Sequence, residues 1–322
     1  MKVVLLAAGI GKRLSPVTNY LPKPMIPIAG KPLLEYILVD LIDSGFDDIC
    51  IVVGHEENHI KKYFNGWKKN DIKIVFVTQD KYIGTAHATL CAKNFVGNDK
   101  FLLYLSDTLI PFDLQSKLQE MKTDKNDISI LSSQSFINDS GSVGNIIIEN
   151  NFVKEISEKS KNPKSNQAWA GLAIFSDASI FKILENLAPS KHGEYDITEA
   201  MNIALKNNKI IKNYSCKKFI DCGTAEGLVD GLKFILTNKC HPNKNNPLQN
   251  SLEPIYIGTD CLFGKNVIIG PFVSLGDNVV VGDNVKISKS IVFSHTKIPS
   301  NSIISGSILL HDTSLSVDEN LL

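Results

Sequence analysis

Short aliphatic runs alternate with amphipathic segments from residue 1 to about residue 240. Strands that alternate with helices are typical of an α/β layered domain, so we predict a mostly parallel, mixed sheet. The aliphatic runs predict strands at 2–7, 48–53, 72–77, 101–105, 127–132, 145–149, 170–175 and 210–214. The segments between them predict helices that include 31–44, 56–64, 84–94, 112–121, 177–186 and 196–206.

The hydrophobic period changes near the C-terminus. The stretch 241–252 is rich in Pro, Asn and Lys and reads as a linker between a first domain, 1–240, and a second, 253–322. From Ile255 an aliphatic residue leads most units of six, and glycine or serine keeps one phase of the repeat. A period of six predicts a parallel β-helix with three units per coil, whereas a β-meander would not keep phase over nine units.

Composition excludes several classes of function. Among 322 residues, Lys+Arg and Asp+Glu both number 34, so no net charge attracts the whole molecule to nucleic acid or to anionic lipid. The six cysteines include no CxxC pair, and no stretch approaches the roughly 20 apolar residues of a membrane span. We therefore expect a cytoplasmic protein with reduced thiols and with neither nucleic acid nor membrane as its partner.

Two glycines and two cations follow the first predicted strand. In 9-GIGKR-13, Gly9 and Gly11 let the backbone approach a ligand, and Arg13 offers planar donors for phosphate oxygens. Ten residues further on, Lys23 stands between two prolines, which restrict the backbone around it. A lone GxGxR would be better explained as a tight turn with surface cations, but the combination with Lys23 predicts a polyphosphate site.

With its motifs in this order, the chain resembles the sugar-1-phosphate nucleotidylyltransferases, and most closely the long form of glucose-1-phosphate thymidylyltransferase. The resemblance implies a Rossmann-like nucleotidyltransferase domain followed by a left-handed β-helix of hexapeptide repeats. It implies that a sugar 1-phosphate and a nucleoside triphosphate form a nucleotide sugar and pyrophosphate. The segments that carry the likeness are 6–37, 78–88, 103–109, 158–175, 193–200 and 220–228.

The resemblance also assigns roles to individual residues. Arg13, Lys23 and Asp107 would be catalytic, and Asp107 and Asp221 would hold a catalytic Mg²⁺, for which carboxylate oxygens are suitable ligands. Capping of a helix after a strand is the alternative for both aspartates. The nucleotide would contact Leu6, Ala8, Gly9, Gly11, Arg13, Gln79 and Gly84. The sugar phosphate would contact Gly144, Glu158, Lys159, Gly171 and Glu194.

Some of these assignments have alternatives in which the residue has no catalytic role. The Gln79 amide can donate to and accept from a pyrimidine edge, but it could equally be an exposed polar residue at a strand end. Ser160 and His192 stand where the family usually has proline and arginine. These departures favour a paralogue that binds nucleotide sugars without turnover, whereas retention of Arg13 and Lys23 favours an enzyme.

Two further motifs point to other chemistry. The string 55-HEENH-59 matches a zinc-protease pattern, but His55 directly follows a predicted strand and is expected in a turn rather than on a helix. Folds related to the β-helix include acyltransferases, for which His295 and His311 are candidate bases. Because the repeat makes little more than three coils, we expect it to assemble homo-oligomers instead.

These observations together predict a Mg²⁺-dependent enzyme that makes dTDP-glucose from dTTP and glucose 1-phosphate. The alternatives are UTP or GTP as the nucleotide and the binding-only paralogue. The sequence fixes neither the sugar nor the number of subunits.

Overall fold

The computed structural model describes residues 1–65, 67, 72–134, 144–157, 164–190, 193–240, 251–310 and 313–316, the last four as backbone only. The chain divides into two compact units, one made of residues 1–10 and 37–219 and the other of residues 11–36 and 220–322. These units are defined by which residues lie close together in space. The domain boundaries at 240 and 253 were instead predicted from the start of the six-residue repeat, and they stay a prediction. Within the described residues no helix is long and apolar enough to cross a membrane.

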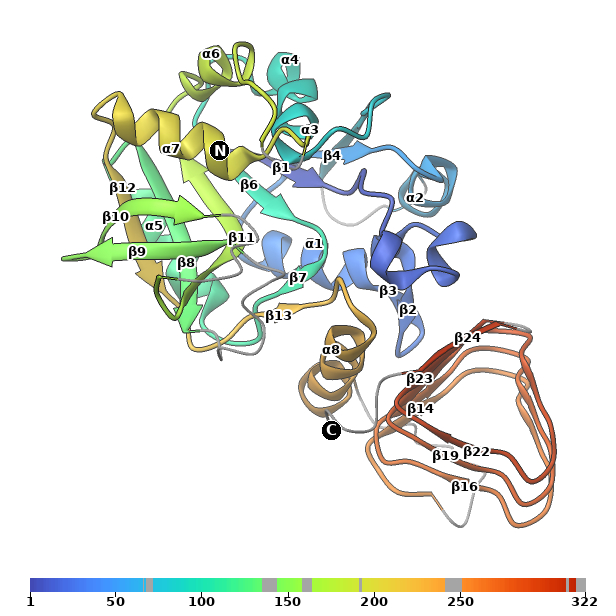
Figure 1. The fold of residues 1–322 in the computed structure, drawn as a ribbon. Helices are drawn as coiled ribbons and strands as arrows, with labels where there is room; N and C mark the ends of the chain where they lie inside the picture. Colours follow the sequence, from blue (N-terminus) through green and yellow to red (C-terminus); the bar gives the residue numbers. More distant parts are fainter. Residues whose placement is uncertain are drawn as a thin grey trace. The chain divides into compact units, whose positions relative to one another are not determined.

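A nine-stranded sheet forms the centre of the first unit, in the order β5-β4-β1-β6-β11-β8-β12-β10-β9 (Figure 1). All eight predicted strands are confirmed within two or three residues at their ends. The strands are β1 Lys2–Leu6, β4 Asp48–Val53, β5 Lys73–Thr78, β6 Phe101–Leu105, β8 Ile128–Gln134, β9 Asn145–Glu149, β10 Phe152–Ser157, β11 Gln167–Phe175 and β12 Ile211–Ser215.

Strand β1 lies between two parallel neighbours. Its residues pair with β4 on one side and β6 on the other, and β4 pairs in parallel with β5. Val3, Val4 and Leu5 are fully buried, which is why the strand is a continuous aliphatic run rather than an alternating one.

The prediction of a mostly parallel sheet is correct for the β5-β4-β1-β6 half, and β12 also pairs in parallel with β8. In the other half β11 pairs antiparallel with both β6 and β8, and β10 pairs antiparallel with β9 and β12. The strand β10 was not predicted. It follows β9 after Asn150 and Asn151, both at positive φ (51° and 67°), which is the conformation of a two-residue hairpin turn.

The helices cover the sheet through small and aliphatic side chains. One core cluster joins Val4 and Leu103 of the sheet to Ala88 of α3, Phe181 of α6 and Ala200 of α7. The helices are α1 Leu33–Asp43, α2 Glu57–Phe64, α3 Thr85–Cys91, α4 Lys93–Val96, α5 Leu114–Thr123, α6 Ile180–Leu184, α7 Ile197–Lys206 and α8 Ala225–Asn238.

The predicted helices differ from the observed ones at their ends. The helix predicted at 84–94 breaks at Ala92, whose φ of −83° and ψ of 1° are not helical. The helix predicted at 177–186 is reduced to α6. The helix α8 was not predicted, because Gly227 and Gly231 lower the helix propensity of its segment.

In the second unit, the described part of the C-terminal repeat (residues 253–322) forms three sheets, which are parallel except for the antiparallel pairing of the last strand. Strands in one sheet pair with residues 17 or 18 positions away, as Ile255 pairs with Val273 and Val273 with Ser290. This spacing equals three units of six and is consistent with a parallel β-helix. The strands are β14 Ile255–Ile257, β15 Leu262–Phe263, β16 Ile268–Ile269, β17 Val273–Leu275, β18 Val280–Val281, β19 Lys286–Ser288, β20 Ser290–Val292, β21 Lys297–Ile298, β22 Ile303–Ser305, β23 Ser307–Leu310 and β24 Thr313–Ser316.

The recurring glycines of the repeat are explained by crowding between successive coils. A Cβ added at Gly264 would lie 2.4 Å from Asp283 Oδ1 and 2.6 Å from the carbonyl carbon of Gly282. One row of left-handed corners carries asparagine. Asn266, Asn284 and Asn301 have φ near 60°, and their side-chain amides hydrogen-bond from coil to coil at 3.1 Å.

All six cysteines are free. Burial raises the pKa of Cys50 to about 12 and that of Cys216 to about 11, so both thiols stay protonated near neutral pH. Cys222 is buried as well, whereas Cys91, Cys240 and Cys261 are half-buried.

A buried carboxylate ties the end of α5 to β12 and makes stability depend on pH. Burial would raise the pKa of Asp124, but hydrogen bonds from the Tyr214 hydroxyl, the Asn126 amide and Lys212 outweigh it and lower the pKa to about 2. Because the pKa is lower in the folded state, this stabilisation is present above pH 4 and is lost as the pH falls towards 2. We expect Asp124→Asn to destabilise the protein by about 2 kcal/mol at pH 6 and by progressively less below pH 4.

Urea unfolding of both proteins from pH 6 down to pH 3 measures this difference. Glu120→Gln, at an exposed residue paired with Lys117, is the control and should show little effect. A difference between wild type and Asp124→Asn that does not change over this range would contradict the account.

Candidate functional site

In the first unit, the carboxyl ends of four parallel strands lie at one edge of the sheet. Strands β1, β4, β5 and β6 end at Leu6, Val53, Thr78 and Leu105. The Leu6 carbonyl accepts hydrogen bonds from both the amide and the hydroxyl of Ser106, at 3.2 and 2.7 Å. The loops that follow β1 and β6 therefore start side by side, at the edge where such sheets bind ligands.

The loop after β1 is packed at Ala8 and open at Gly9. Ala8 is buried, and a Cβ added at Gly54 would lie 3.0 Å from both its Cβ and its carbonyl oxygen. Gly9 is exposed, and a Cβ added there would meet no protein atom within 4 Å. The protein's own packing therefore does not require glycine at position 9.

Asp107 lies immediately beyond β6, one residue after Ser106. The side chains of Leu105 and Thr108, near it on either side, lie against Gly171 of β11, where an added Cβ would lie 3.0 Å from Leu105 Cδ1 and 3.1 Å from Thr108 Oγ1. Gly144, whose carbonyl accepts from the Trp169 amide at 2.8 Å, lies along the same strand. The structure thus brings together Asp107, Gly171 and Gly144, which the sequence assigns to the metal and the sugar phosphate.

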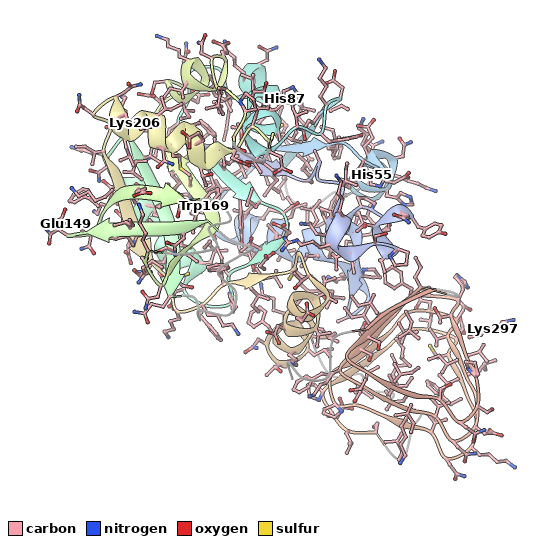
Figure 2. All side chains as sticks on the ribbon, in the orientation of Figure 1. His55, His87, Glu149, Trp169, Lys206 and Lys297 are labelled. Carbon is pink, nitrogen blue, oxygen red and sulfur yellow. The ribbon has the colours of Figure 1, made fainter. Side chains whose placement is uncertain are left out.

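Gln79 follows β5 and is 3% exposed, so the alternative of an exposed polar residue is wrong for it. Its side-chain nitrogen donates to the Gly84 carbonyl at 3.1 Å and lies 3.1 Å from His87 Nδ1. Both amide hydrogens are therefore used inside the protein, and Oε1 is the atom that remains to accept from a ligand. His87, labelled in Figure 2, is a neighbour that the sequence did not point to.

Gly84 lies against the segment that carries Glu194. A Cβ at Gly84 would lie 2.4 Å from the Tyr195 carbonyl oxygen, and the Tyr195 amide donates to the Ile83 carbonyl at 2.7 Å. Ile197 in turn donates to the Thr85 hydroxyl at 3.0 Å. The segment of Glu194, assigned to the sugar side, thereby adjoins Gly84, which is assigned to the base.

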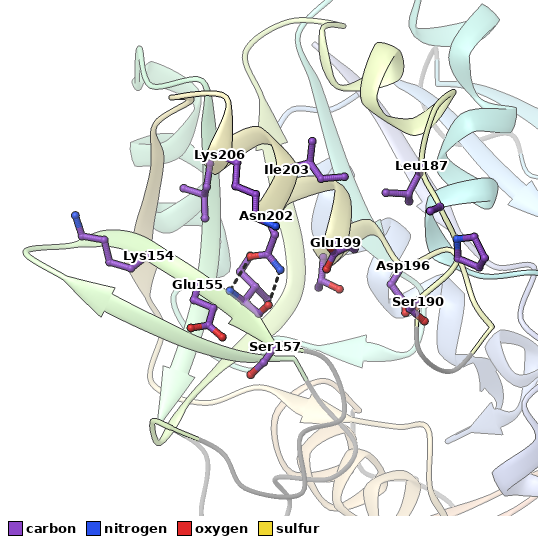
Figure 3. A pocket seen from close by; sticks show the side chains of 15 residues that line it. Lys154, Glu155, Ser157, Leu187, Ser190, Asp196, Glu199, Asn202, Ile203 and Lys206 are labelled. Atoms are coloured by element: carbon purple, nitrogen blue, oxygen red, sulfur yellow. Dashed lines mark hydrogen bonds between the residues drawn. The ribbon is translucent and has the colours of Figure 1, made fainter.

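A hollow of about 850 Å³ lies between β10 and α7 and borders the same segments (Figure 3). Asn202 joins α7 to β10 beside this hollow. Its side chain accepts from the Ile156 amide at 3.0 Å and donates to the Ile156 carbonyl at 2.6 Å. Ser157 and Ser190 line the hollow, and the backbone amide of Ser190 donates to the Glu194 carbonyl at 2.7 Å. Glu158 and Lys159, together with Ser160 and His192, lie outside the described residues.

In the second unit, Gly11 and Lys23 come together around Thr18. Three short 3-10 helices, Lys12–Leu14, Val17–Asn19 and Lys23–Met25, fold this segment. The Thr18 hydroxyl donates to the Gly11 carbonyl at 2.9 Å, and a Cβ at Gly11 would lie 3.4 Å from Lys23 Cβ. Gly11 has φ of 72°, a left-handed conformation that glycine adopts at least cost. Thr18 is thus the residue that closes the loop, a role that its spacing alone did not reveal.

Arg13 and Asp221 form an ion pair within the second unit, with Nη2 and Oδ2 separated by 3.7 Å. Asp221 Oδ1 accepts from the Gly223 amide at 2.8 Å. A Cβ at Gly223 would lie within 2.7 Å of both side chains, so the two charged groups share a space that only glycine leaves open. Thr224, not Asp221, caps helix α8 through its hydroxyl, so the capping alternative is wrong for Asp221.

The donor set at these positions suits a hard divalent cation, since Asp221 and Asp107 offer carboxylate oxygens at strand ends. No group of three or more His, Cys, Asp or Glu side chains able to hold a metal is found in the described parts of the chain. Because Asp107 and Asp221 belong to different units, their shared metal stays a prediction.

The zinc-protease pattern does not form a helical site. His55 lies in the turn before α2, and Glu56 has a left-handed φ of 51°, so the helix starts only at Glu57 (Figure 2). The interpretation of this motif as a turn is confirmed. Of the two candidate acyltransferase bases, His295 is exposed at a corner of the repeat with φ of 65°, and His311 lies outside the described residues.

Comparison with known proteins identifies the family. The family model described as Nucleotidyl transferase matches residues 2–238, and the GMPPB C-terminal domain matches residues 251–317. The low-salt glycan biosynthesis nucleotidyltransferase Agl11 of Haloferax volcanii is 30% identical over 74% of this chain and 67% of its own length. The bifunctional protein GlmU of Methanococcus aeolicus is 36% identical over 74% of this chain, but the match spans only 55% of GlmU. The UTP–glucose-1-phosphate uridylyltransferase AglF of Haloferax volcanii is 30% identical over 66% of this chain and 86% of its length.

Solved structures agree with this fold. A UDP-glucose pyrophosphorylase complexed with UDP-glucose has a TM-score of 0.65 at 28% identity, over 71% of this chain and 96% of the other. A Bacillus anthracis protein described as a candidate glucose-1-phosphate thymidylyltransferase has a TM-score of 0.66 at 28% identity, over 76% of this chain and 98% of the other. The first unit therefore has the Rossmann-like α/β fold of these enzymes. The chain belongs to the nucleotidyl transferase family.

Proposed function

We propose that this protein is a sugar-1-phosphate nucleotidylyltransferase that makes dTDP-glucose from dTTP and glucose 1-phosphate, with UTP as the nearest alternative nucleotide. The observation that carries the proposal is the loop after β1. Its glycine at position 9 is not required by packing, while Gly11, Arg13 and Lys23 follow at the family's spacing and Gly11 lies beside Lys23. A ligand with closely spaced negative charges explains both features.

The reaction needs position and charge rather than a protein nucleophile. An anionic oxygen of the sugar phosphate attacks the α-phosphorus of the nucleotide, the bond from that phosphorus to the β-phosphate bridging oxygen breaks, and pyrophosphate leaves with the electron pair. Lys23 and Arg13 would neutralise charge that develops on the phosphates. A Mg²⁺ held by Asp107 and Asp221 would supply further charge neutralisation.

The base and sugar positions follow from the same edge of the first unit. Gln79 Oε1 would accept from N3–H of thymine or uracil, since the amide nitrogen is already bonded within the protein. Leu6, Ala8 and Gly84 would shape the nucleotide side. Gly144, Gly171 and Glu194 would face the sugar, with Glu158 and Lys159 as further predicted contacts. Because thymine and uracil present the same hydrogen-bonding edge, Gln79 does not distinguish dTTP from UTP.

The names of the similar proteins support both nucleotides. AglF is a uridylyltransferase by name, one similar solved structure is a UDP-glucose pyrophosphorylase, and another is described as a candidate thymidylyltransferase. A GTP-dependent enzyme is a further alternative. A binding-only paralogue would keep the pocket and lose turnover.

Pyrophosphate release tests the proposal directly. Purified protein with Mg²⁺ is assayed with each of dTTP, UTP, GTP and ATP against several sugar 1-phosphates. We expect release with a pyrimidine nucleotide, and we expect Lys23→Ala to lower kcat by about 100- to 1000-fold with the fold intact. Lys12→Ala, at an exposed cation of the same loop, is the matched control and should change kcat little.

Two outcomes would count against this account. Release from no combination, together with tight binding of a nucleotide sugar, would establish the binding-only paralogue. Full activity of Lys23→Ala would remove that residue from the catalytic set.

Substitution of the two loop glycines by alanine should have different effects. Gly9→Ala should leave the free energy of unfolding unchanged and raise KM for the nucleotide, because the added methyl group meets ligand and not protein. Gly11→Ala should destabilise the protein by about 1–2 kcal/mol, because it combines a left-handed φ with a contact of 2.9 Å to Thr18 Cγ2. Urea unfolding and steady-state kinetics separate the two effects, and an equal loss of stability in both variants would refute the distinction.

We propose that the C-terminal repeat joins copies of this chain. Two of its aliphatic side chains are strongly exposed, Leu262 at 64% and Ile303 at 81%. Light scattering should show an oligomer for the wild type and a smaller species for Ile303→Asp. Phe152→Asp, at an exposed apolar residue of β10, is the control. A monomeric wild type would contradict the proposal.

A further inference from the structure

The tip of a small hairpin in the second unit is hydrogen-bonded to the C-terminal repeat. Strands β2 Pro27–Ile28 and β3 Lys31–Pro32 form the hairpin, with Ala29 and Gly30 at its tip. The Ala29 amide donates to Ser274 Oγ at 3.0 Å, and both residues are at least 95% buried. A buried amide bonded to a side chain 245 positions away is a specific contact, since loss of its acceptor would leave the amide unsatisfied.

A second side chain, from the strand next to that of Ser274, lies against the tip of the hairpin. A Cβ added at Gly30 would lie 2.1 Å from the Tyr256 hydroxyl oxygen and 2.5 Å from the ring carbon that bears it. Tyr256 on β14 and Ser274 on β17 are paired in register. Two neighbouring residues of one strand pair therefore hold the hairpin tip, and no side chain fits at position 30 unless the tyrosine moves.

The hairpin is a short and stiff extension of the segment that carries Lys23. The 3-10 helix Lys23–Met25 is closed by the Ile26 amide donating to the Lys23 carbonyl at 3.1 Å, and β2 begins at the next residue. The Tyr36 hydroxyl fixes the hairpin from the other side by donating to the Ile28 carbonyl at 2.8 Å. With prolines at 22, 24 and 27, this segment has little backbone freedom with which to absorb a shift of the tip.

Helix α8 connects Asp221 to the same sheet. It begins at Ala225, four residues after Asp221, and it contacts β2 as well as β20 and β23. A Cβ at Gly227 would lie 1.8 Å from the Asp221 carbonyl oxygen, so the first turn of the helix is pressed against the strand that carries the carboxylate. The sheet of β14, β17, β20 and β23 thus meets both the hairpin and the helix.

We infer that this sheet of the C-terminal repeat is a platform that positions Lys23 and Asp221 for nucleotidyl transfer, with Ser274 and Tyr256 as positioning residues. The inference rests on the proposed function for its catalytic consequence. It gives the repeat a part in catalysis within a single chain, separate from any role in assembly.

Hydrogen exchange in the free, full-length protein tests the physical link without any substrate. We expect Ser274→Ala to speed exchange in the peptide that spans residues 23–30 by about three- to tenfold, the effect of losing one hydrogen bond. Ser290→Ala is the matched control. Its hydroxyl bonds to Ser288 and Ser307 inside the repeat, so it should disturb the repeat and leave exchange at 23–30 unchanged.

Kinetics test the catalytic consequence. Ser274→Ala should lower kcat for pyrophosphate release by about three- to tenfold with KM for the sugar phosphate unchanged, since Lys23 acts on the reacting phosphates. Ser274→Thr keeps the hydroxyl and should recover most of the loss. A general loss of stability would instead reduce the active fraction in Ser274→Ala and Ser290→Ala alike.

The outcomes separate the two proposals. Wild-type protein that releases no pyrophosphate would overturn the proposed function, while exchange at 23–30 would still report on the platform. Unchanged exchange in Ser274→Ala, or an equal change in Ser290→Ala, would overturn the platform. Faster exchange with unchanged kcat would show that the contact is structural only and overturn its role in positioning.

Discussion

The parallel pairing of β1 with both β4 and β6 is the constraint on which the candidate site depends. A strand bonded on both sides cannot shift its register without breaking both ladders, so the position at which its loop begins is fixed. The Leu6 carbonyl then accepts two hydrogen bonds from Ser106, which joins the loop after β1 to the loop that carries Asp107. Gln79 and Gly171 reach the same region because β5 ends at that edge and β11 begins its pairing with β6 there.

Glycine serves three different needs in this protein. At Gly11 the need is conformational, since the chain takes a left-handed turn beside Thr18. At Gly84, Gly227 and Gly264 the need is space, because neighbouring backbone comes within the radius of a side chain. At Gly9 neither need exists within the protein, and the proposed function assigns this position to contact with the nucleotide. Among the loop glycines, Gly9 is therefore the one whose substitution tests ligand contact apart from stability.

The sequence predicted most of the first unit because its strands are aliphatic and its turns are short. It missed β10, since Asn150 and Asn151 make a hairpin whose second strand, FVKEIS, is too polar to stand out. It missed α8, whose glycines at 227 and 231 weaken the helix signal although packing against Asp221 requires the first of them. It overestimated parallel pairing, because local pattern does not reveal where β11 inserts between β6 and β8.

For the site, motif spacing indicated candidate residues but not the contacts that each of them makes. The Gln79 amide bonds to Gly84 and His87 because the chain turns back on itself after β5. The Ala29–Ser274 bond joins chain segments that are 245 positions apart. Such contacts arise from tertiary packing, and the pattern of hydrophobic and polar residues along the sequence does not reveal them.

Transfer of the nucleotidyl group is the central claim, and its most direct test follows the label in α-³²P-labelled nucleotide. When protein, Mg²⁺, labelled dTTP or UTP and glucose 1-phosphate are combined, the account predicts label in a nucleotide sugar and none in the pyrophosphate released. Label that stays in the triphosphate, or that appears only in a nucleoside monophosphate, would contradict it.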